Sequence, residues 1–333
     1  MSASTIQDVA KAANVSVATV SRVINNSSSV AQSTRDVVLK AIKKLDYRPN
    51  LLGRNLRRTE TRLVLALLPT IANPFYSHIV KGMEDIAHKN GYNVMLCNTD
   101  SSVDRERIYL ELLKNRLADG VIFMAPEIGG EELTAIGEHF HVVQCCEYKE
   151  GAQVPLASID NHQAAKKVAK HLISLGHKRI GMISCRNRFL STMRREQGFR
   201  VAMEEAGIAF EEELVVYGDY SFKSGRRGAI SLMELSERPT AIFAISDIMA
   251  IGVLRAARET GLSVPEDLAV VGFDNISFAS MCEPMLTTIS QPKYDLGCTA
   301  MELLLRKIRG ELKEPVDIVL ENELVIREST MKS

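Results

Sequence analysis

One pattern limits the fold of this 333-residue chain more than any other: an apolar strand, a helix and a glycine follow one another, and the order recurs. The strand, helix and strand of the first occurrence are expected at 62–68, 75–90 and 94–97, and those of the second at 180–184, 193–206 and 214–217. Continuous apolar strands that alternate with helices indicate parallel sheets covered by helices on both faces. We therefore predict an α/β body of two lobes, with a cleft where the carboxyl ends of the strands meet.

The charge is unevenly distributed along the chain. Overall, 41 Lys and Arg balance 41 Asp and Glu, but residues 1–62 hold 11 basic and only four acidic side chains. A basic segment on an acidic body suggests that the segment faces a polyanion and the body does not. A solvated charged segment without a partner is the alternative.

Three short helices are expected in this basic segment. They cover residues 6–13, 17–24 and a stretch that begins near residue 33. Thr5 and Asp8 form a capping box before the first helix, Ser16 caps the second, and Ser33 with Asp36 resembles a further capping box. Two short helices joined by so tight a turn are typical of a helix-turn-helix.

The second helix has an outward face that suits DNA. Its inward side carries Val20, Val23 and Ile24, and its outward side carries Val17, Ala18, Ser21, Arg22 and Asn25. Small side chains at the electropositive helix start allow a close approach to base edges, and an arginine reaches guanine or phosphate. We predict that this helix enters a major groove, while a three-helix module that serves packing alone stays the alternative.

The motifs IQDVAKAANVSVATVSRVINN and Tyr47-x-Pro49-Asn50, followed by a short segment with Leu56, resemble those of the LacI/GalR family of bacterial transcription factors. The resemblance implies a helix-turn-helix domain at 1–48, a hinge helix at 49–61 and an effector-binding and dimerisation domain at 62–333. It also implies two lobes, 62–161 with 292–323 and 162–290 with 324–333. In the family, hinge helices pair in the minor groove and a leucine at the position of Leu56 wedges between bases, while a linker leucine with no partner is the alternative.

The expected DNA contacts come from the helix-turn-helix and the hinge. In the first they are Thr5, Ser16, Val17, Ala18, Thr19, Ser21, Arg22, Asn25 and Tyr47, and in the second Asn50, Gly53, Arg54, Leu56 and Arg57. Gly53 and Arg57 stand where the family often has alanine. Because glycine disfavours a helix by roughly 1 kcal/mol, we expect the hinge to order only on DNA.

An enzyme is not indicated. The chain has no GxGxxG, GxxxxGK[ST], GxSxG or HExxH motif. The nearest metal candidates are His139, His141, Cys145, Cys146 and Glu147. Since Cys145 and Cys146 are adjacent, they are expected to point to opposite faces of a strand, so we predict neither a metal nor a cofactor.

The resemblance to the family places an effector in the cleft. The implied contacts are Asn73, Phe75, Tyr76, Asp160, Arg195, Tyr220, Ser246, Asp247, Asp274 and Gln291. A guanidinium and a carboxylate, from Arg195 and Asp274, can hold vicinal hydroxyls while an aromatic ring covers a sugar. The alternatives are an ion pair between Arg195 and Asp274 across the lobes, and core packing for Phe75 and Tyr76.

Some positions depart from the family pattern. Cys146-Glu147 stands where many sugar-responsive relatives have Asp-Arg, and Ser246 stands where asparagine is usual. Four arginines, Arg186, Arg188, Arg194 and Arg195, fall within ten residues near the cleft. A solvated loop is the alternative for Arg186 and Arg188. The resemblance to the family favours a neutral sugar as the effector, and a sugar acid or sugar phosphate is the competing expectation.

Taken as a whole, the sequence predicts a homodimeric repressor of a carbohydrate-utilisation operon that binds a palindromic operator. No leader or bilayer-long apolar run is seen, and the six cysteines show no CxxC spacing, so a cytoplasmic protein with free thiols and no membrane contact is expected. The segment from Gln291 to Asp295 resembles that of the family's catabolite regulator near its phosphoprotein-binding helix, but Glu302 replaces an arginine there. A solute-binding protein without a DNA role is the alternative class.

Overall fold

The computed structural model describes residues 4–24, 27, 29–47, 60–186 and 189–331. The chain divides into two compact units, Met1–Thr61 and Arg62–Ser333. Among the described residues, no helix is both long enough and apolar enough to cross a bilayer.

The first unit contains three helices around one small core. The helices are α1 (Ile6–Ala12), α2 (Val17–Ile24) and α3 (Gln32–Lys44). Val9, Val20 and Val38, one from each helix, are fully buried in this core. The predicted Thr5–Asp8 capping box is confirmed, and Ser16 Oγ accepts a hydrogen bond from the backbone N–H of Thr19, at 3.1 Å.

The start of α3 differs from the prediction. The helix begins at Gln32, after Ala31, so Ser33 lies inside its first turn and is not its cap. Asp36 instead accepts a hydrogen bond from Nε2 of Gln32, at 2.8 Å. The expected Ser33–Asp36 capping box is therefore wrong, because a residue already in helical conformation cannot serve as the cap.

The first lobe of the body is built on a parallel six-stranded sheet in the order β11-β5-β4-β3-β1-β2. Its strands are β1 (Leu63–Leu68), β2 (Asn93–Asn98), β3 (Gly120–Phe123), β4 (Val142–Cys145), β5 (Leu156–Ile159) and β11 (Asp317–Leu320). Its helices are α5 (Phe75–Lys89), α6 (Val103–Lys114), α7 (Gly130–His139) and α12 (Lys293–Ile308). Alternate residues of β1 serve different cores: Val64 and Ala66 pack with α5 and α12, whereas Leu65 and Leu67 pack with α6 and α7.

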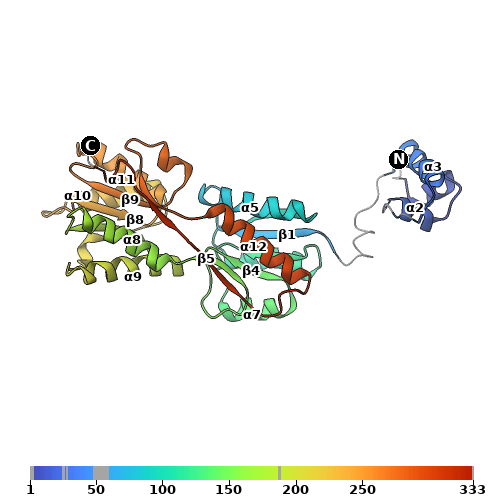
Figure 1. Cartoon of the computed structure of the whole chain (residues 1–333), viewed down its shortest axis with the longest axis horizontal. Coiled ribbons are helices and arrows are strands. Elements are labelled where there is room, and N and C mark those ends of the chain that lie inside the picture. Colours follow the sequence, from blue (N-terminus) through green and yellow to red (C-terminus); the bar gives the residue numbers. More distant parts are fainter. Residues whose placement is uncertain (1–3, 25–26, 28, 48–59, 187–188, 332–333) are drawn as a thin grey trace. The chain divides into compact units, whose positions relative to one another are not determined.

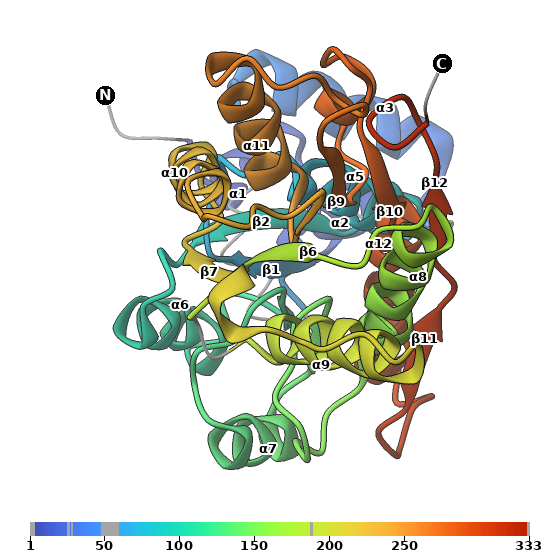
Figure 2. The same ribbon diagram turned by 90° about the vertical axis from the view of Figure 1, so that its left-hand side faces the viewer.

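The second lobe repeats this plan with the order β12-β10-β9-β8-β6-β7. Its strands are β6 (Ile180–Cys185), β7 (Val215–Gly218), β8 (Ala241–Ala244), β9 (Ala269–Asp274), β10 (Thr287–Ser290) and β12 (Glu323–Val325), of which β12 is antiparallel to β10. Its helices are α8 (Asn161–Ser174), α9 (Leu190–Glu205), α10 (Phe222–Met233) and α11 (Asp247–Glu259), with short 3-10 helices at Glu212–Leu214 and Ser277–Ser280. Figure 2 shows α10 and α11 on one side of β6, and α8 and α9 on the other.

The chain passes between the lobes three times: after β5, after β10 and after β11. The last crossing, coloured red in Figure 1, carries β11 of one sheet and β12 of the other. Parallel strands alternate with helices on both sides, so the predicted fold class is confirmed for the helix-turn-helix unit and the two-lobed body. The expected hinge helix lies outside the described residues.

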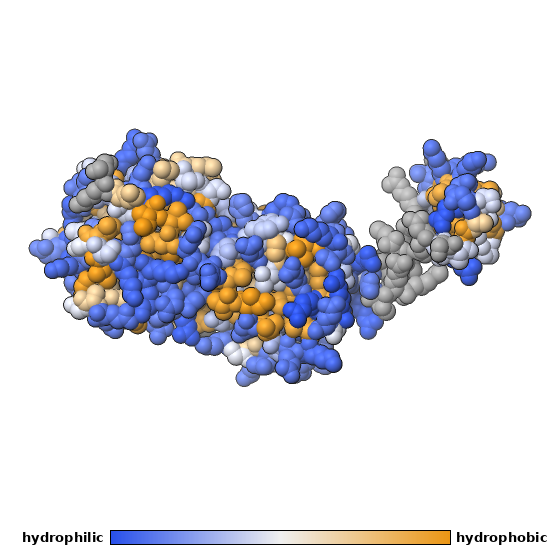
Figure 3. Space-filling view, viewed as in Figure 1, coloured by the Kyte–Doolittle hydropathy of each residue, from blue (hydrophilic) through white to orange (hydrophobic). Residues whose placement is uncertain are grey.

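Helices on the same face of a sheet touch through glycine. A Cβ atom on Gly297 of α12 would lie 1.9 Å from the backbone oxygen of Ile79 in α5, and one on Gly198 of α9 would lie 2.1 Å from that of His162 in α8. Backbones this close leave little room for the helices to slide, so each lobe is expected to behave as a rigid body. The face seen in Figure 3 is mostly hydrophilic, with apolar areas on both lobes.

Candidate functional site

Three residues of the outward face of α2, Val17, Ala18 and Arg22, lie outside the core of the unit, as the sequence predicts. Val20 and Val23 are buried, while Val17 is 36% exposed and Ala18 and Arg22 are exposed. The exposed side chains follow a capped helix start, where backbone N–H groups favour a negatively charged partner. This arrangement suits a helix that inserts into a DNA groove.

Other predicted DNA contacts have local partners. Thr5 donates its hydroxyl to the carboxylate of Asp8, at 2.7 Å, and the hydroxyls of Ser16 and Thr19 lie 2.9 Å apart. Tyr47 is half-buried and packs against the core of the unit. Ser21 is also half-buried. The remaining predicted contacts, Asn25, Asn50, Gly53, Arg54, Leu56 and Arg57, lie outside the described residues.

A cavity of about 200 Å³, partly open to solvent, lies between the two lobes of the body. Seven predicted effector contacts line it: Asn73, Phe75, Tyr76, Arg195, Tyr220, Asp274 and Gln291. They come from both lobes and from the crossing after β10. The structure thus brings these residues together, while their role in binding an effector stays a prediction.

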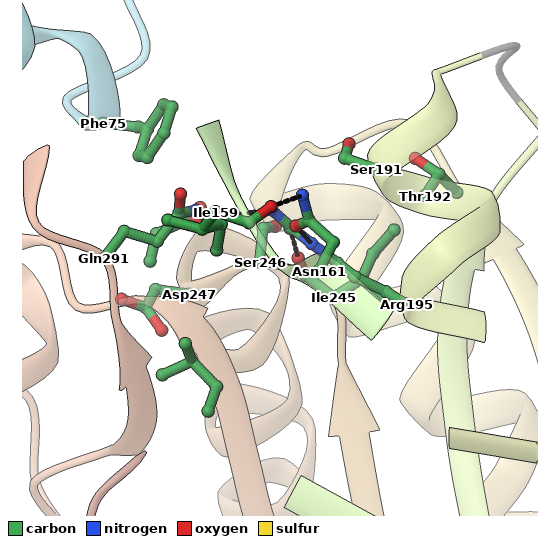
Figure 4. Close-up of polar contacts among 12 residues, drawn as sticks. Phe75, Ile159, Asn161, Ser191, Thr192, Arg195, Ile245, Ser246, Asp247 and Gln291 are labelled. Atoms are coloured by element: carbon green, nitrogen blue, oxygen red, sulfur yellow. Dashed lines mark hydrogen bonds and ion pairs between the residues drawn. The ribbon is translucent and has the colours of Figure 1, made fainter. Parts of the chain in front are cut away.

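Arg195 is held rigidly in the second lobe. Its Nε donates to Oδ1 of Asn161, at 2.9 Å, and its Nη1 donates to the backbone oxygen of Ile245, at 2.7 Å (Figure 4). Its guanidinium carbon lies 3.6 Å from the ring centre of Phe273. Because the side chain is buried and oriented before any ligand arrives, it loses little freedom on binding.

Asp274 lies beside Arg195 at the carboxyl end of β9. Its Oδ1 is 3.9 Å from Nη2 of Arg195 and accepts a hydrogen bond from Nε2 of Gln291, at 2.8 Å. Both members of this ion pair belong to the second lobe, so a pair across the lobes is ruled out. Burial raises the pKa of Asp274 from 3.8 to about 6, although Arg195 and Gln291 act in the opposite direction.

Aromatic side chains form the opposite part of the wall. The rings of Phe75 and Tyr76 meet edge to face at 5.1 Å, and both side chains are more than nine-tenths buried while still bordering the cavity. The hydroxyl of Tyr220 lies 2.7 Å from that of Thr192. Burial raises the pKa of Tyr220 to about 12 and that of Tyr76 well above its usual value, so both phenols are neutral hydrogen-bonding groups.

Three predicted effector contacts lie away from the cavity lining. Asp160 is exposed and caps α8 by accepting from the backbone N–H of Gln163, at 2.9 Å. Ser246 caps α11. Asp247 is fully buried and accepts from the backbone N–H of Ile276 and the hydroxyl of Thr288, at 2.8 and 2.6 Å. All three side chains thus accept hydrogen bonds from the protein's own backbone or hydroxyl groups. Asp160 and Ser246 cap helices and do not border the cavity.

Sequence reasoning missed other members of the lining. Asn161, Ser191 and Asp219 border the cavity, and Asn161 orients Arg195 directly. Glu147 crosses from the first lobe to accept a hydrogen bond from the backbone N–H of Ser191, at 3.0 Å, at the start of α9. Burial raises the pKa of Glu147. The charge of Glu147, just after an apolar strand, was the signal that could have identified it.

Two of the four arginines, Arg186 and Arg194, do not line the cavity. Arg194 pairs with Glu150, at 3.0 Å, and the guanidinium of Arg186 lies over the ring of Tyr217, at 4.7 Å. Arg188 lies outside the described residues. Among the described lining residues, Arg195 is the one guanidinium, beside the carboxyl groups of Glu147, Asp219 and Asp274.

Adjacent cysteines also form part of this wall. Cys145 ends β4 and is buried, whereas Cys146 is half-buried and lines the cavity. Cys146 has a φ of 69°, in the left-handed region, and its Sγ lies 3.6 Å from that of Cys145. The prediction that the two side chains point to opposite faces is wrong, because the left-handed residue breaks the alternation of the strand. No group of three or more metal-ligating side chains occurs among the described residues.

A helix-turn-helix whose second helix exposes Val17, Ala18 and Arg22, joined in one chain to a two-lobed body with a central cavity, defines a ligand-controlled transcription regulator. Residues 5–50 match the family model of the bacterial regulatory proteins of the lacI family, and residues 169–330 match that of a periplasmic binding protein-like domain. The chain belongs to the lacI family.

The relatives are regulators rather than enzymes. Catabolite control protein A of Priestia megaterium is 38% identical over 98% of this chain and 99% of its own. The HTH-type transcriptional repressor CytR of Escherichia coli is 37% identical over 98% of this chain and 96% of its own. The lac repressor dimer bound to operator and an anti-inducer has a TM-score of 0.90 at 27% identity, covering 99% of this chain and 100% of that one. The predictions of a DNA-binding regulator without enzyme activity are confirmed.

Proposed function

We propose that this regulator is a homodimeric repressor whose effector is a neutral, hydroxyl-rich, sugar-like molecule bound between the lobes. The observation that carries the proposal is the prepared pair of Arg195 and Asp274. The guanidinium donates and the carboxylate accepts, so together they can hold vicinal hydroxyls. Phe75 and Tyr76 offer apolar rings to the face of a sugar.

The charges of the cavity argue against an anionic effector. The described lining carries Glu147, Asp219 and Asp274 but only Arg195 as a counter-charge, and Arg195 already has protein partners. A carboxylate or phosphate on the ligand would meet more negative than positive charge in a partly dehydrated site. A neutral sugar avoids this repulsion. One solved relative, the CelR–cellobiose complex, is 34% identical with a TM-score of 0.74 and supports a sugar as the ligand class.

A thermal-shift screen tests the effector class, because a ligand that binds the native state raises its melting temperature. Matched sets of a neutral sugar, its uronic acid and its phosphate are compared on the full chain. We expect shifts with neutral members, lost in Asp274→Ala and kept in Arg194→Ala, whose side chain pairs with Glu150 instead. Shifts confined to acids or phosphates would reject the proposal.

We propose that two copies bind a palindromic operator through α2. The lac repressor is a dimer on its operator in the related structure. Here Ile71 and Leu96 of the first lobe, and Phe278 and Met281 of the second, are between 47% and 72% exposed. Large apolar side chains on both lobes favour pairing of two bodies. Operator DNA lies in the bacterial cytoplasm, and we place the protein there.

We infer that the effector acts by favouring one arrangement of the lobes. Binding can shift the equilibrium only by the difference in its affinity for the two arrangements. The domain limits proposed for this coupling are 1–48 for DNA binding, 49–61 for the hinge and 62–333 for the effector-binding and dimerisation domain. Selection of sites from random DNA, with and without effector, measures both the operator and the coupling.

We propose no phosphoprotein partner for this regulator. The similarity to catabolite control protein A is spread over the whole chain. Glu302, however, is exposed on α12 and carries a negative charge where a phosphate would need a positive one.

A further inference from the structure

Cys145 and Cys146 have the geometry of a paired thiol site rather than of two unrelated cysteines. Their Sγ atoms lie 3.6 Å apart in the wall of the cavity. Cys146 borders the cavity, while Cys145 is buried behind it and its Sγ lies 3.8 Å from the backbone oxygen of Leu296. One thiol is therefore open to small molecules, and the other is shielded but within reach of the first.

The backbone makes this pairing specific. In an extended strand, successive side chains point to opposite faces, so adjacent cysteines do not normally meet. Here the φ of 69° at Cys146 turns its side chain back towards Cys145, in a conformation that a residue with a Cβ rarely adopts. Left-handed residues of this kind cluster at functional sites.

We propose that Cys145 and Cys146 form an oxidisable vicinal dithiol, which a hydroperoxide closes into a disulfide ring in the cavity wall. The Cys146 thiolate attacks the outer peroxide oxygen, the O–O bond breaks, and an alcohol leaves as Cys146 becomes a sulfenic acid. Cys145 Sγ then attacks Cys146 Sγ and displaces the oxygen as water. Two S–H bonds are lost and one S–S bond forms, while the peroxide is reduced by two electrons and takes up two protons.

The ring is expected to be reversible. The Cα atoms of neighbouring residues lie about 3.8 Å apart, closer than in ordinary disulfides, which makes the ring strained. Strained and exposed disulfides are the easily reduced class. The contact with Cys145 and burial raise the pKa of Cys146, so its thiolate is scarce and oxidation is slow at neutral pH.

Closure of the ring bears on the contact between the lobes. Glu147 follows Cys146 directly and bonds to the backbone N–H of Ser191 at the start of α9 in the second lobe. A ring across residues 145 and 146 fixes the backbone just before Glu147. The oxidised form therefore changes both the cavity wall and the support that Glu147 gives to α9.

Peptide mapping tests the proposal on the full chain. The tryptic peptide 117–149, released after Arg116 and ending at Lys149, contains Cys145 and Cys146 and no other cysteine. After treatment with hydrogen peroxide, neither cysteine of the peptide is expected to be alkylated by iodoacetamide. The mass of the peptide should be about 2 Da lower than that of its dithiol form. Dithiothreitol should restore two alkylation sites.

Cysteine variants distinguish a disulfide between Cys145 and Cys146 from oxidation of cysteines elsewhere in the chain. Cys298→Ser, which changes a half-buried cysteine of α12, should behave as wild type, whereas Cys146→Ser should leave Cys145 open to iodoacetamide. Two iodoacetamide groups on peptide 117–149 after peroxide, or a disulfide to another peptide, would overturn the proposal. Oxidised protein is also expected to melt at a different temperature, reversibly; an unchanged melting temperature would overturn the link to α9.

Discussion

Replacement of Asp274 by asparagine is expected to stabilise the fold while it abolishes effector binding. Asp274 is 7% exposed, and its pKa is raised from 3.8 to about 6 by burial. A carboxyl group that binds its proton more tightly in the native state than in the unfolded chain stabilises the fold at low pH. That stability is lost as the pH rises towards and through 6. At pH 7 the ionised group therefore opposes folding.

The size of this effect follows from the two pKa values. At about 1.4 kcal/mol per pH unit, the raised pKa corresponds to about 3 kcal/mol at pH 7, falling to about 1.6 kcal/mol at pH 5. The attraction to Arg195 is already included, because it acts on the same pKa. Asparagine keeps the amide oxygen for Gln291 and tolerates the positive φ of 111° at this position. A gain of about 3 kcal/mol corresponds to a rise in melting temperature of roughly 5 to 10 °C.

Melting curves of wild type and Asp274→Asn from pH 5 to pH 8 measure the prediction. The difference in melting temperature should shrink as the pH falls. Asp219→Asn is the control, for which the change in stability has the opposite sign. Hydrogen bonds from Ser221 and Ser224 lower the pKa of Asp219 to about 2, so loss of this carboxylate should slightly destabilise the protein. If Asp274→Asn melts at or below wild type at pH 7, the carboxylate does not oppose folding and the argument fails.

Three further predictions concern other parts of the molecule. Arg22→Ala should change the free energy of binding by about 1 to 3 kcal/mol for each base pair that Arg22 contacts, and so change which sites are selected from random DNA. The melting temperature should stay the same. If the variant and the wild type enrich the same sites equally, Arg22 does not read the bases. Met281→Asp should shift the dimer towards monomer in sedimentation without loss of helix content, since its side chain is 72% exposed; an unaltered mass would place the interface elsewhere. Gly297→Ala should lower the melting temperature by forcing α5 and α12 apart, unlike Gly129→Ala, which adds a methyl group to open space.

Local patterns were enough to predict most of the fold. The Thr5–Asp8 capping box, the spacing of Val20 and Val23, and the apolar run of β1 each specify an element through contacts close in sequence. The three crossings between lobes came from the resemblance to the family. Local reasoning failed at α3, where Ser33 has the right chemistry for a cap but the helix starts one residue before it.

The site was less predictable because it depends on where each side chain is held. Asp160 and Asn161 are neighbours, yet Asp160 caps α8 at the surface while Asn161 turns inward to Arg195. No sequence pattern distinguishes these two orientations. Likewise, the left-handed conformation of Cys146 arises from the turn after β4 and its packing, which the sequence does not reveal.

The exchange of late segments between the lobes has a consequence for synthesis. The first lobe needs α12 and β11, which the ribosome makes only after nearly all of the second lobe. A nascent chain that has reached Ser290 therefore exposes the apolar face of α5, and β5 has no neighbour on its β11 side. Such unpaired edges and apolar surfaces attract chaperones or promote aggregation. The helix-turn-helix unit has its own core, built from residues between Ile6 and Tyr47, and can fold long before the body that controls it.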